Sequence, residues 1–231
     1  MDESEFDRFA DEYHQQHAAS IRLSGEDPEF FHRYKISDVA QKLSEAGIAP
    51  KKILDFGAGV GNSLGPMLEA FPKASIVLLD PSVRSLEVAR GRYPGQAEFR
   101  QFDGQRIPFE DDTFDLVFAA CVFHHIPESL HVPLFVEIRR VMASGASFFV
   151  FEHNPRNPLT RKAVHDCPFD ENAVLIPAGK LSDRLKAAGF SDHNISYRIF
   201  FPRFLRPLRR LERLLRGVPF GAQYFTHAIK H

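Results

Sequence analysis

Residues 53–62 read Ile53-Leu54-Asp55-Phe56-Gly57-Ala58-Gly59-Val60-Gly61-Asn62, an apolar run that breaks into three closely spaced glycines. The pattern predicts a buried strand over residues 52–55, a tight turn, and a helix from about residue 62 to residue 70. Glycine permits positive φ and lets backbone N–H groups approach a ligand without a Cβ atom in the way. Because helix N-termini favour negative charge, we expect a carboxylate or phosphate group of a ligand at this turn.

The spacing of the glycines argues against a nicotinamide dinucleotide. The dinucleotide fingerprint is G-x-G-x-x-G, whereas this turn reads G-x-G-x-G and has Asn62 at the last position of the fingerprint. A tight connection without any ligand is the simpler alternative, but two later acids favour a ligand. Asp80 ends the next apolar run, where a carboxylate can accept both hydroxyls of a ribose. Asp103 ends the following run and is suited to accept from the exocyclic amine of an adenine.

Four blocks together resemble a known family, the class I S-adenosylmethionine-dependent methyltransferases of the type 11/12 kind. The blocks are LDFGAGVGN at 54–62, LLDPS at 78–82, FDGQRIPFEDDTFDLVF at 102–118 and FHHI at 123–126. They cover roughly residues 36–153 in the family's order and spacing, and as a set they are specific. The resemblance implies a Rossmann-like, doubly wound α/β fold. Its mostly parallel seven-stranded sheet has helices on both faces and an antiparallel last strand.

The resemblance also implies bound S-adenosyl-L-methionine, with S-adenosyl-L-homocysteine as the product. The glycine turn would frame the methionine end, Asp80 would bind the ribose, and Asp103 would lie at the adenine. The cofactor residues expected on this basis are Asp55, Gly57, Ala58, Gly59, Gly61, Asn62, Asp80, Pro81, Asp103, Gly104, Ala120 and Cys121.

The amino-terminal segment predicts a helical lid over residues 1–35. Apolar residues recur there at helical steps, and Phe6-Asp7-Arg8-Phe9-Ala10-Asp11-Glu12-Tyr13 fits the FD-x-x-A-x-x-Y segment that folds across the cofactor in many members of the resembled family. Tyr13 is the residue expected to reach the ligand, and packing on the core is the alternative. We expect a short helix over residues 29–34 and another over residues 36–46.

Composition is typical of one compact enzyme. The 231 residues are 44% hydrophobic, which suits a single domain with a lid (1–35), a cofactor-binding core (36–153) and a substrate-side region (154–231). A formal net charge of -1 gives no reason to expect a nucleic-acid partner. Two cysteines do not form a disulfide framework, and the sequence shows neither a signal peptide nor a membrane span. We therefore expect a cytoplasmic protein.

From residue 51 onward, short apolar strands alternate with helical stretches, which is typical of a parallel sheet. We expect helices over residues 82–92, 128–142 and 178–188. Strands are expected over residues 147–151, 194–200 and 223–230. Ligands bind outside the carboxyl ends of such strands. Gly57, Asp80, Asp103, Cys121 and Glu152 all fall there.

Three histidines are candidates for a general base. His124 and His125 follow the strand that ends at Ala120, and His153 follows Glu152 in a segment that the prolines are expected to hold toward the cleft. Shaping of the turn alone is an equal alternative for the pair, so His153 is the preferred base. We expect no metal, because two adjacent side chains rarely point at the same ion. Arg156 or Arg161 would hold an anionic substrate group, or lie on the surface.

The tail over residues 204–216 interleaves arginines with bulky apolar residues, which predicts a basic amphipathic helix after Pro207. Such a helix can lie on an anionic membrane surface. The favoured alternative is a crossover helix that buries Leu208, Leu211 and Leu215 on the sheet.

The sequence thus predicts a methyltransferase that acts on an oxygen or carbon of a small or carrier-linked metabolite, or of a lipid-linked one if the tail meets a membrane. Two alternatives remain: a non-catalytic module that binds the cofactor or its product, and an NAD-dependent oxidoreductase. Neither the acceptor nor the oligomeric state follows from the sequence.

Overall fold

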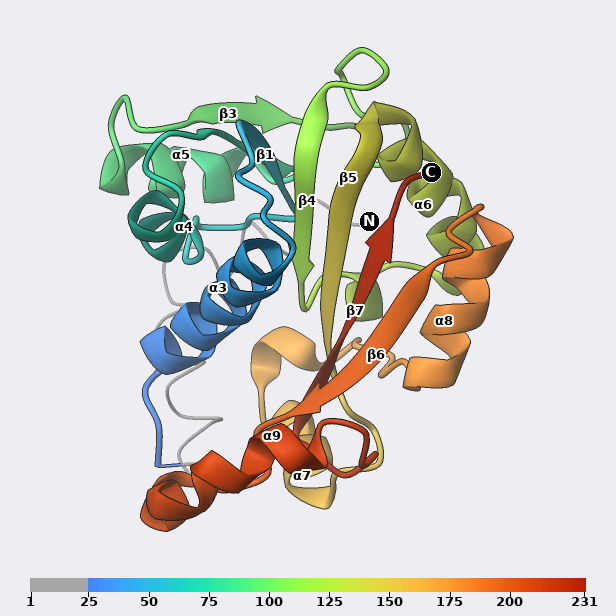
Figure 1. Cartoon of the computed structure of the whole chain (residues 1–231). Coiled ribbons are helices and arrows are strands. Elements are labelled where there is room, and N and C mark those ends of the chain that lie inside the picture. The colour runs from blue at the N-terminus through green and yellow to red at the C-terminus, as the bar shows by residue number, and fades with distance from the viewer. Residues whose placement is uncertain (1–24) are drawn as a thin grey trace.

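The computed structural model describes residues 25–231, which form one seven-stranded sheet in the order β3-β2-β1-β4-β5-β7-β6 (Figure 1). Neighbouring strands from β3 to β5 are parallel, and β7 runs antiparallel to both β5 and β6. This confirms the predicted fold. The strands are β1 (Lys52–Phe56), β2 (Ser75–Asp80), β3 (Glu98–Gln101), β4 (Phe114–Ala120), β5 (Met142–His153), β6 (His193–Arg198) and β7 (Gln223–Ile229).

Helices cover both faces of the sheet. Figure 1 shows α3, α4 and α5 on one side and α6 and α8 on the other, and each side has its own apolar core. The α-helices are α3 (Pro28–Glu45), α4 (Leu64–Ala70), α5 (Val83–Arg92), α6 (Glu128–Val141), α7 (Pro158–His165), α8 (Ala178–Ala187) and α9 (Glu212–Leu215). The 3-10 turns are η2 (Phe123–His125), η3 (Pro168–Asp170) and η4 (Arg203–Leu211). The parallel strands thus end together at one edge of the molecule.

One continuous helix, α3, replaces the two helices expected over residues 29–34 and 36–46. Asp27 caps it by accepting from the Phe30 backbone N–H at 2.7 Å, and Pro28 occupies the first turn. No helix breaker separates the two predicted segments, and the buried Ile36 packs the middle of the helix onto the core. Tyr13 and the rest of the expected lid over residues 1–24 lie outside the described residues.

Strand β5 is longer than the expected 147–151, because it begins directly after α6, at Met142. Gly145, expected in a loop, lies inside the strand with φ +77, where the pairing of β5 with β4 shifts register. The strand continues through Glu152 and His153, so these residues are held by the sheet. The following Asn154, expected to face the cleft, instead donates to the carbonyls of Pro219 and Gly221.

The tail also differs from its prediction. Residues 203–211 form a 3-10 segment with a kink at Leu205, followed by the four-residue helix α9, so no long amphipathic helix forms. Leu208 and Leu211 are 40% and 49% exposed, which rules out their burial on the sheet. The buried residue is Glu212, which accepts from the backbone N–H groups of residues 200 and 201. Within residues 25–231, no helix has the length and apolar character needed to cross a bilayer.

Candidate functional site

The glycine turn follows β1 and passes close to the end of β4. Gly57, Gly59 and Gly61 have φ values of +71, +52 and +74. A Cβ on Gly57 would lie 2.6 Å from the methyls of Val122, whereas one on Gly59 would meet no atom within 4 Å. Gly57 therefore permits close packing of the two loops, and Gly59 lies beside open space where a ligand can approach.

Asp80 is held at the end of β2 by two backbone donors. Its Oδ2 accepts from the Gly59 N–H at 2.8 Å and its Oδ1 from the Ser82 N–H at 2.9 Å. The side chain is buried, so the carboxylate has a fixed position at the edge of the sheet where ligands of this fold bind.

Asp55, at the end of β1, is 2% exposed, and its Oδ2 makes no hydrogen bond within residues 25–231. Burial, with a smaller effect of the nearby Asp80, raises the pKa of this carboxyl to about 8. A buried carboxyl without a partner is costly unless a ligand supplies one.

The other residues expected at the cofactor are less uniform. Asp103 is exposed and its Oδ1 accepts from the N–H groups of Gln105 and Arg106, which lower its pKa. Asn62 accepts from Arg92 at 2.8 Å. The remaining expected residues, Ala58, Pro81, Gly104 and Ala120, lie in the loops or strand ends along the same edge.

Cys121 directly follows β4 and has φ +60, which few residues other than glycine adopt. Its Sγ lies 3.4 Å from Nζ of Lys35 and contacts His153. Burial acts to raise the pKa of the thiol, but Lys35 and the His153 imidazole outweigh burial and lower the pKa to about 7. The same thiol raises the pKa of His153 against the effect of burial. His153 is also 3.4 Å from the side-chain amide of Gln223, so its ring faces the end of β4.

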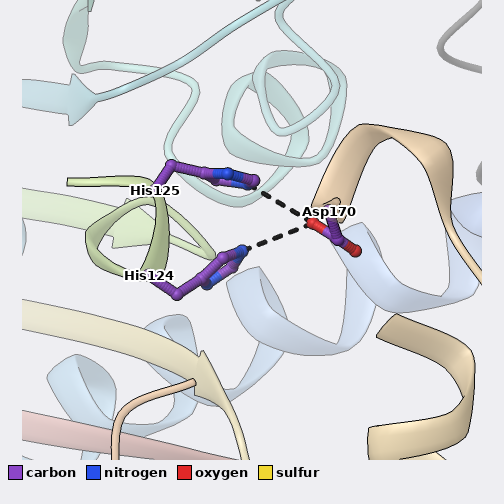
Figure 2. A group of neighbouring side chains, drawn as sticks. All are labelled: His124, His125 and Asp170. Carbon is purple, nitrogen blue, oxygen red and sulfur yellow. Dashed lines mark ion pairs between the residues drawn. The ribbon is translucent and has the colours of Figure 1, made fainter. Parts of the chain in front are cut away.

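A second cluster of polar side chains, formed by Glu152, His124, His125 and Asp170, lies beside Cys121 and His153. Glu152 is fully buried; its Oε2 lies 2.6 Å from Nδ1 of His124, and its Oε1 accepts from the Phe123 N–H at 2.9 Å. Nε2 of His124 and Nε2 of His125 lie 3.6 and 3.4 Å from Oδ1 of Asp170 (Figure 2). Although burial opposes ionisation, these histidines hold the pKa of Asp170 well below its usual range.

His124 and His125 also line a cavity of about 320 Å³ between α6, α8 and the segment after η3. Lys180 and Arg184 lie on its wall, and Arg184 forms a 2.7 Å ion pair with Glu128. The cavity therefore combines imidazoles with two cations, which suits a ligand that carries a carboxylate or phosphate. Arg156 and Arg161, the residues expected to hold an anionic substrate, are exposed instead.

Comparison with known proteins shows which family the chain resembles. Residues 53–145 match the model of a family described as a methyltransferase domain. A trans-aconitate 2-methyltransferase of Methylobacterium nodulans is 33% identical over 150 residues, which are 63% of this chain and 55% of that protein. A malonyl-[acyl-carrier protein] O-methyltransferase of Legionella pneumophila is 38% identical over 108 residues, covering 46% of this chain and 37% of that protein. Over residues 53–145 the chain is therefore similar to a methyltransferase domain, as the motifs of the sequence predicted.

The crystal structure of a methyltransferase from Thermotoga maritima shares the fold of this chain. It superposes with a TM-score of 0.69 over 99% of both chains, at 19% identity. This chain spans about half the length of the curated relatives that it matches first. The family match covers the glycine turn, β2 and the paired histidines, but ends before β7 and before Asp170.

Asp170 is the site residue that the sequence analysis missed. It lies in the segment between β5 and α8, where no periodicity or motif marks it. The sequence shows only that Asp170 is a carboxylate. Which histidines it contacts depends on the path of the loop, and the sequence does not show that path. Lys35 was missed because it was assigned to the boundary between two helices, whereas it lies inside α3 and points at Cys121.

Proposed function

We propose that this protein binds S-adenosyl-L-methionine at the carboxyl ends of β1, β2 and β4 and transfers the methyl group to an oxygen or carbon acceptor. The observation that carries the proposal is the arrangement of Asp80 and Asp55 around the open side of Gly59. A positively charged, ribose-containing ligand suits this pair of carboxyls. The hydroxyls of a ribose suit the fixed Asp80, and an ammonium group suits the unpaired oxygen of Asp55.

The residues present fit this cofactor along its whole length. The glycine turn and Asp55 suit the methionine portion, and Asp103 with Gly104 suits the adenine. Cys121 and Ala120 would adjoin the methyl group. The bound cofactor would supply a sulfonium methyl that is already electrophilic, so the protein need only position the acceptor and accept its proton.

His153 is the base in this proposal. It is held at the end of β5 beside Cys121, and Gln223 restrains its ring. Glu152 instead engages His124, whose ring centroid lies 5.2 Å from that of His153, so the two neighbouring rings have different hydrogen-bond partners. A His153→Gln variant is expected to lower kcat at least about 100-fold with little change in S-adenosylhomocysteine affinity. Unchanged turnover would remove His153 from this role.

The proposed acceptor is a small or carrier-linked metabolite with an acidic group. Names of similar proteins include methyltransferases of trans-aconitate, of malonyl-[acyl-carrier protein] and of fatty acids. Lys180 and Arg184 on the cavity wall support an anionic acceptor. The single-domain organisation and the cytoplasmic location predicted from the sequence remain parts of this proposal.

Calorimetric titration with S-adenosylhomocysteine tests the cofactor. We expect micromolar affinity, roughly -8 kcal/mol, that NAD does not compete for. Asp80→Asn should abolish it, and Asp103→Asn should weaken it. Asp183→Asn, an exposed carboxylate on α8, is the matched control and should bind like the wild type. Absent binding, or binding that Asp80→Asn leaves intact, would overturn the proposal.

We also propose that residues 204–216 contact an anionic membrane surface, which would suit a lipid-linked acceptor. Phe204 and Leu214 are 79% and 82% exposed, and Arg206, Arg210 and Arg213 are exposed beside them. Exposed apolar side chains among arginines are the features that bind such surfaces. The protein should sediment with vesicles that contain phosphatidylserine but not with phosphatidylcholine vesicles. Phe204→Ser with Leu214→Ser should abolish this, and retained sedimentation would refute the contact.

A further inference from the structure

Three ligand atoms of the kind that bind transition metals converge beside the cavity. The 3-10 turn η2 places the rings of His124 and His125 with centroids 4.2 Å apart and planes inclined by 47°. Asp170, on η3, faces both rings from the opposite side, as Figure 2 shows. The two Nε2 atoms and a carboxylate oxygen all lie within 4.8 Å of one another.

The two imidazole-to-carboxylate separations are close to the edges of a tetrahedral site. Ligand bonds of about 2.0–2.1 Å in a zinc tetrahedron give ligand-to-ligand distances of about 3.3–3.4 Å. The imidazole-to-carboxylate distances here are 3.4 and 3.6 Å. Nε2 of the buried His124 makes no hydrogen bond among the residues that the structure describes. For an ion to bind, the two imidazole-to-carboxylate distances need to change by only a few tenths of an ångström.

Glu152 orients one of the ligands from behind. Its carboxylate lies 2.6 Å from Nδ1 of His124, so with an ion bound the ring would keep its proton on Nδ1 and use Nε2 as the ligand atom. The Phe123 N–H holds the other oxygen of Glu152. A carboxylate behind a histidine ligand is a recurrent feature of zinc sites. Together, the two carboxylates bring a charge of -2 to the group, which balances a divalent cation.

We propose that His124, His125 and Asp170 bind a divalent transition-metal ion of the Zn²⁺ class, with the fourth coordination position open to the cavity. The expectation of no metal rested on the adjacency of the two histidines. In the 3-10 turn, however, the neighbouring side chains lie on the same side and both reach one carboxylate oxygen.

The open position suggests what the ion does. His124 and His125 line the cavity together with Lys180 and Arg184, so an oxygen donor with negative charge has both a metal and two cations to bind. This step rests on the proposed function: the ion holds a carboxylate or hydroxyl oxygen of the methyl acceptor. The metal site itself does not depend on that function.

Metal content of the full, untagged chain tests the site. After removal of metal with a chelator, the protein is equilibrated with micromolar free Zn²⁺ and its metal is measured by emission spectroscopy. We expect one equivalent in the wild type and less than about one-tenth in Asp170→Asn and His125→Gln. Asp166→Asn and His165→Gln change exposed residues of the preceding segment and should still bind one equivalent. Far-ultraviolet circular dichroism establishes that each variant is folded.

Cobalt substitution tests the geometry without any variant. Co²⁺ in the wild-type protein should show the intense visible absorption of a tetrahedral site, and acetohydroxamate should shift that absorption by taking the open position. A spectrum that acetohydroxamate leaves unchanged would refute the open position. A wild type that takes up no Zn²⁺, or folded Asp170→Asn and His125→Gln variants that bind a full equivalent, would refute the site.

Calorimetry with S-adenosylhomocysteine on the same samples separates the two proposals. Nucleoside binding without Zn²⁺ uptake removes the metal site and leaves the proposed function intact. Zn²⁺ uptake without nucleoside binding removes the proposed function and leaves the metal site intact.

Discussion

Asp55 should destabilise the ligand-free protein, and replacing it should therefore increase stability while weakening the binding of S-adenosylhomocysteine. Burial raises its pKa from 3.8 to about 8 in the folded state. At pH 7 the unfolded chain has released this proton and the folded protein still holds it. Because the folded pKa is the higher one, the stability contributed by this group is full below pH 3.8 and is lost as pH rises toward 8.

The size of the effect follows from the pKa difference. Between pH 3.8 and pH 7 the loss amounts to at most about 4 kcal/mol, at about 1.36 kcal/mol for each pH unit. Asn has nearly the same shape as the protonated carboxyl but cannot ionise. We therefore expect Asp55→Asn to raise the free energy of unfolding by about 2–4 kcal/mol at pH 7 and by less than about 1 kcal/mol at pH 4.

Urea unfolding of the ligand-free protein at pH 4, 5.5 and 7 measures this gain, and calorimetry measures the lost affinity. The loss for S-adenosylhomocysteine should be at least tenfold, about 1.4 kcal/mol, because the ammonium group loses its carboxylate. Asp183→Asn is the matched surface control and should change stability by no more than about 0.5 kcal/mol. A stability difference that is absent at pH 7, or that does not change with pH, would refute the assignment of a strained, protonated Asp55.

Three further predictions concern the rest of the fold. Burial and the nearby Lys42 lower the pKa of His227 to about 4, so the free energy of unfolding falls as pH decreases from 6.5 to 4. In urea unfolding at pH 5, His227→Gln should remove up to about 2 kcal/mol of that loss. Asp38→Ala leaves Arg198 without the carboxylate that it contacts at 2.6 and 2.8 Å, and should lower the free energy of unfolding by about 3 kcal/mol. The double variant Asp38→Leu with Arg198→Met should recover most of this loss. Gly57→Ala, with φ +71 and a Cβ 2.6 Å from a valine methyl, should cost about 2 kcal/mol in thermal unfolding and weaken S-adenosylhomocysteine binding.

The sheet could be predicted because its information is local. The central strands are short apolar runs, and some of the helices have a start or a stop that the sequence marks. The Ser82 cap of α5 and the left-handed Gly47 after α3 are examples. The position of Asp80 follows from the same logic, since a polar residue that ends a buried parallel strand must lie at the ligand edge.

The tail and the metal cluster could not be predicted, because they depend on contacts between distant segments. Residues 204–216 have the composition of an amphipathic helix, yet the buried Glu212 accepts from two backbone N–H groups of the preceding loop, and Pro207 donates none. In the cluster, Asp170 meets His124 and His125 only because the loop after β5 crosses back over η2. Neither contact leaves a periodic signal in the sequence.

Both proposed ligand sites follow from one property of the carboxyl edge of the sheet. The strands bury Asp55 and Glu152 so completely that these side chains depend on a few fixed partners, and the partners differ. Glu152 contacts His124 and accepts from a backbone N–H. The atom left without a hydrogen bond among the described residues is therefore Nε2 of His124. Within residues 25–231, Oδ2 of Asp55 has no hydrogen-bond partner, and burial raises the pKa of this carboxyl to about 8. Burying these polar groups in the apolar sheet costs free energy of folding. A ligand that supplies the missing partner of either group offsets part of that cost. For this reason the binding of the nucleoside should stabilise the fold more strongly than contact area alone would suggest, and the metal should do the same through a separate set of residues.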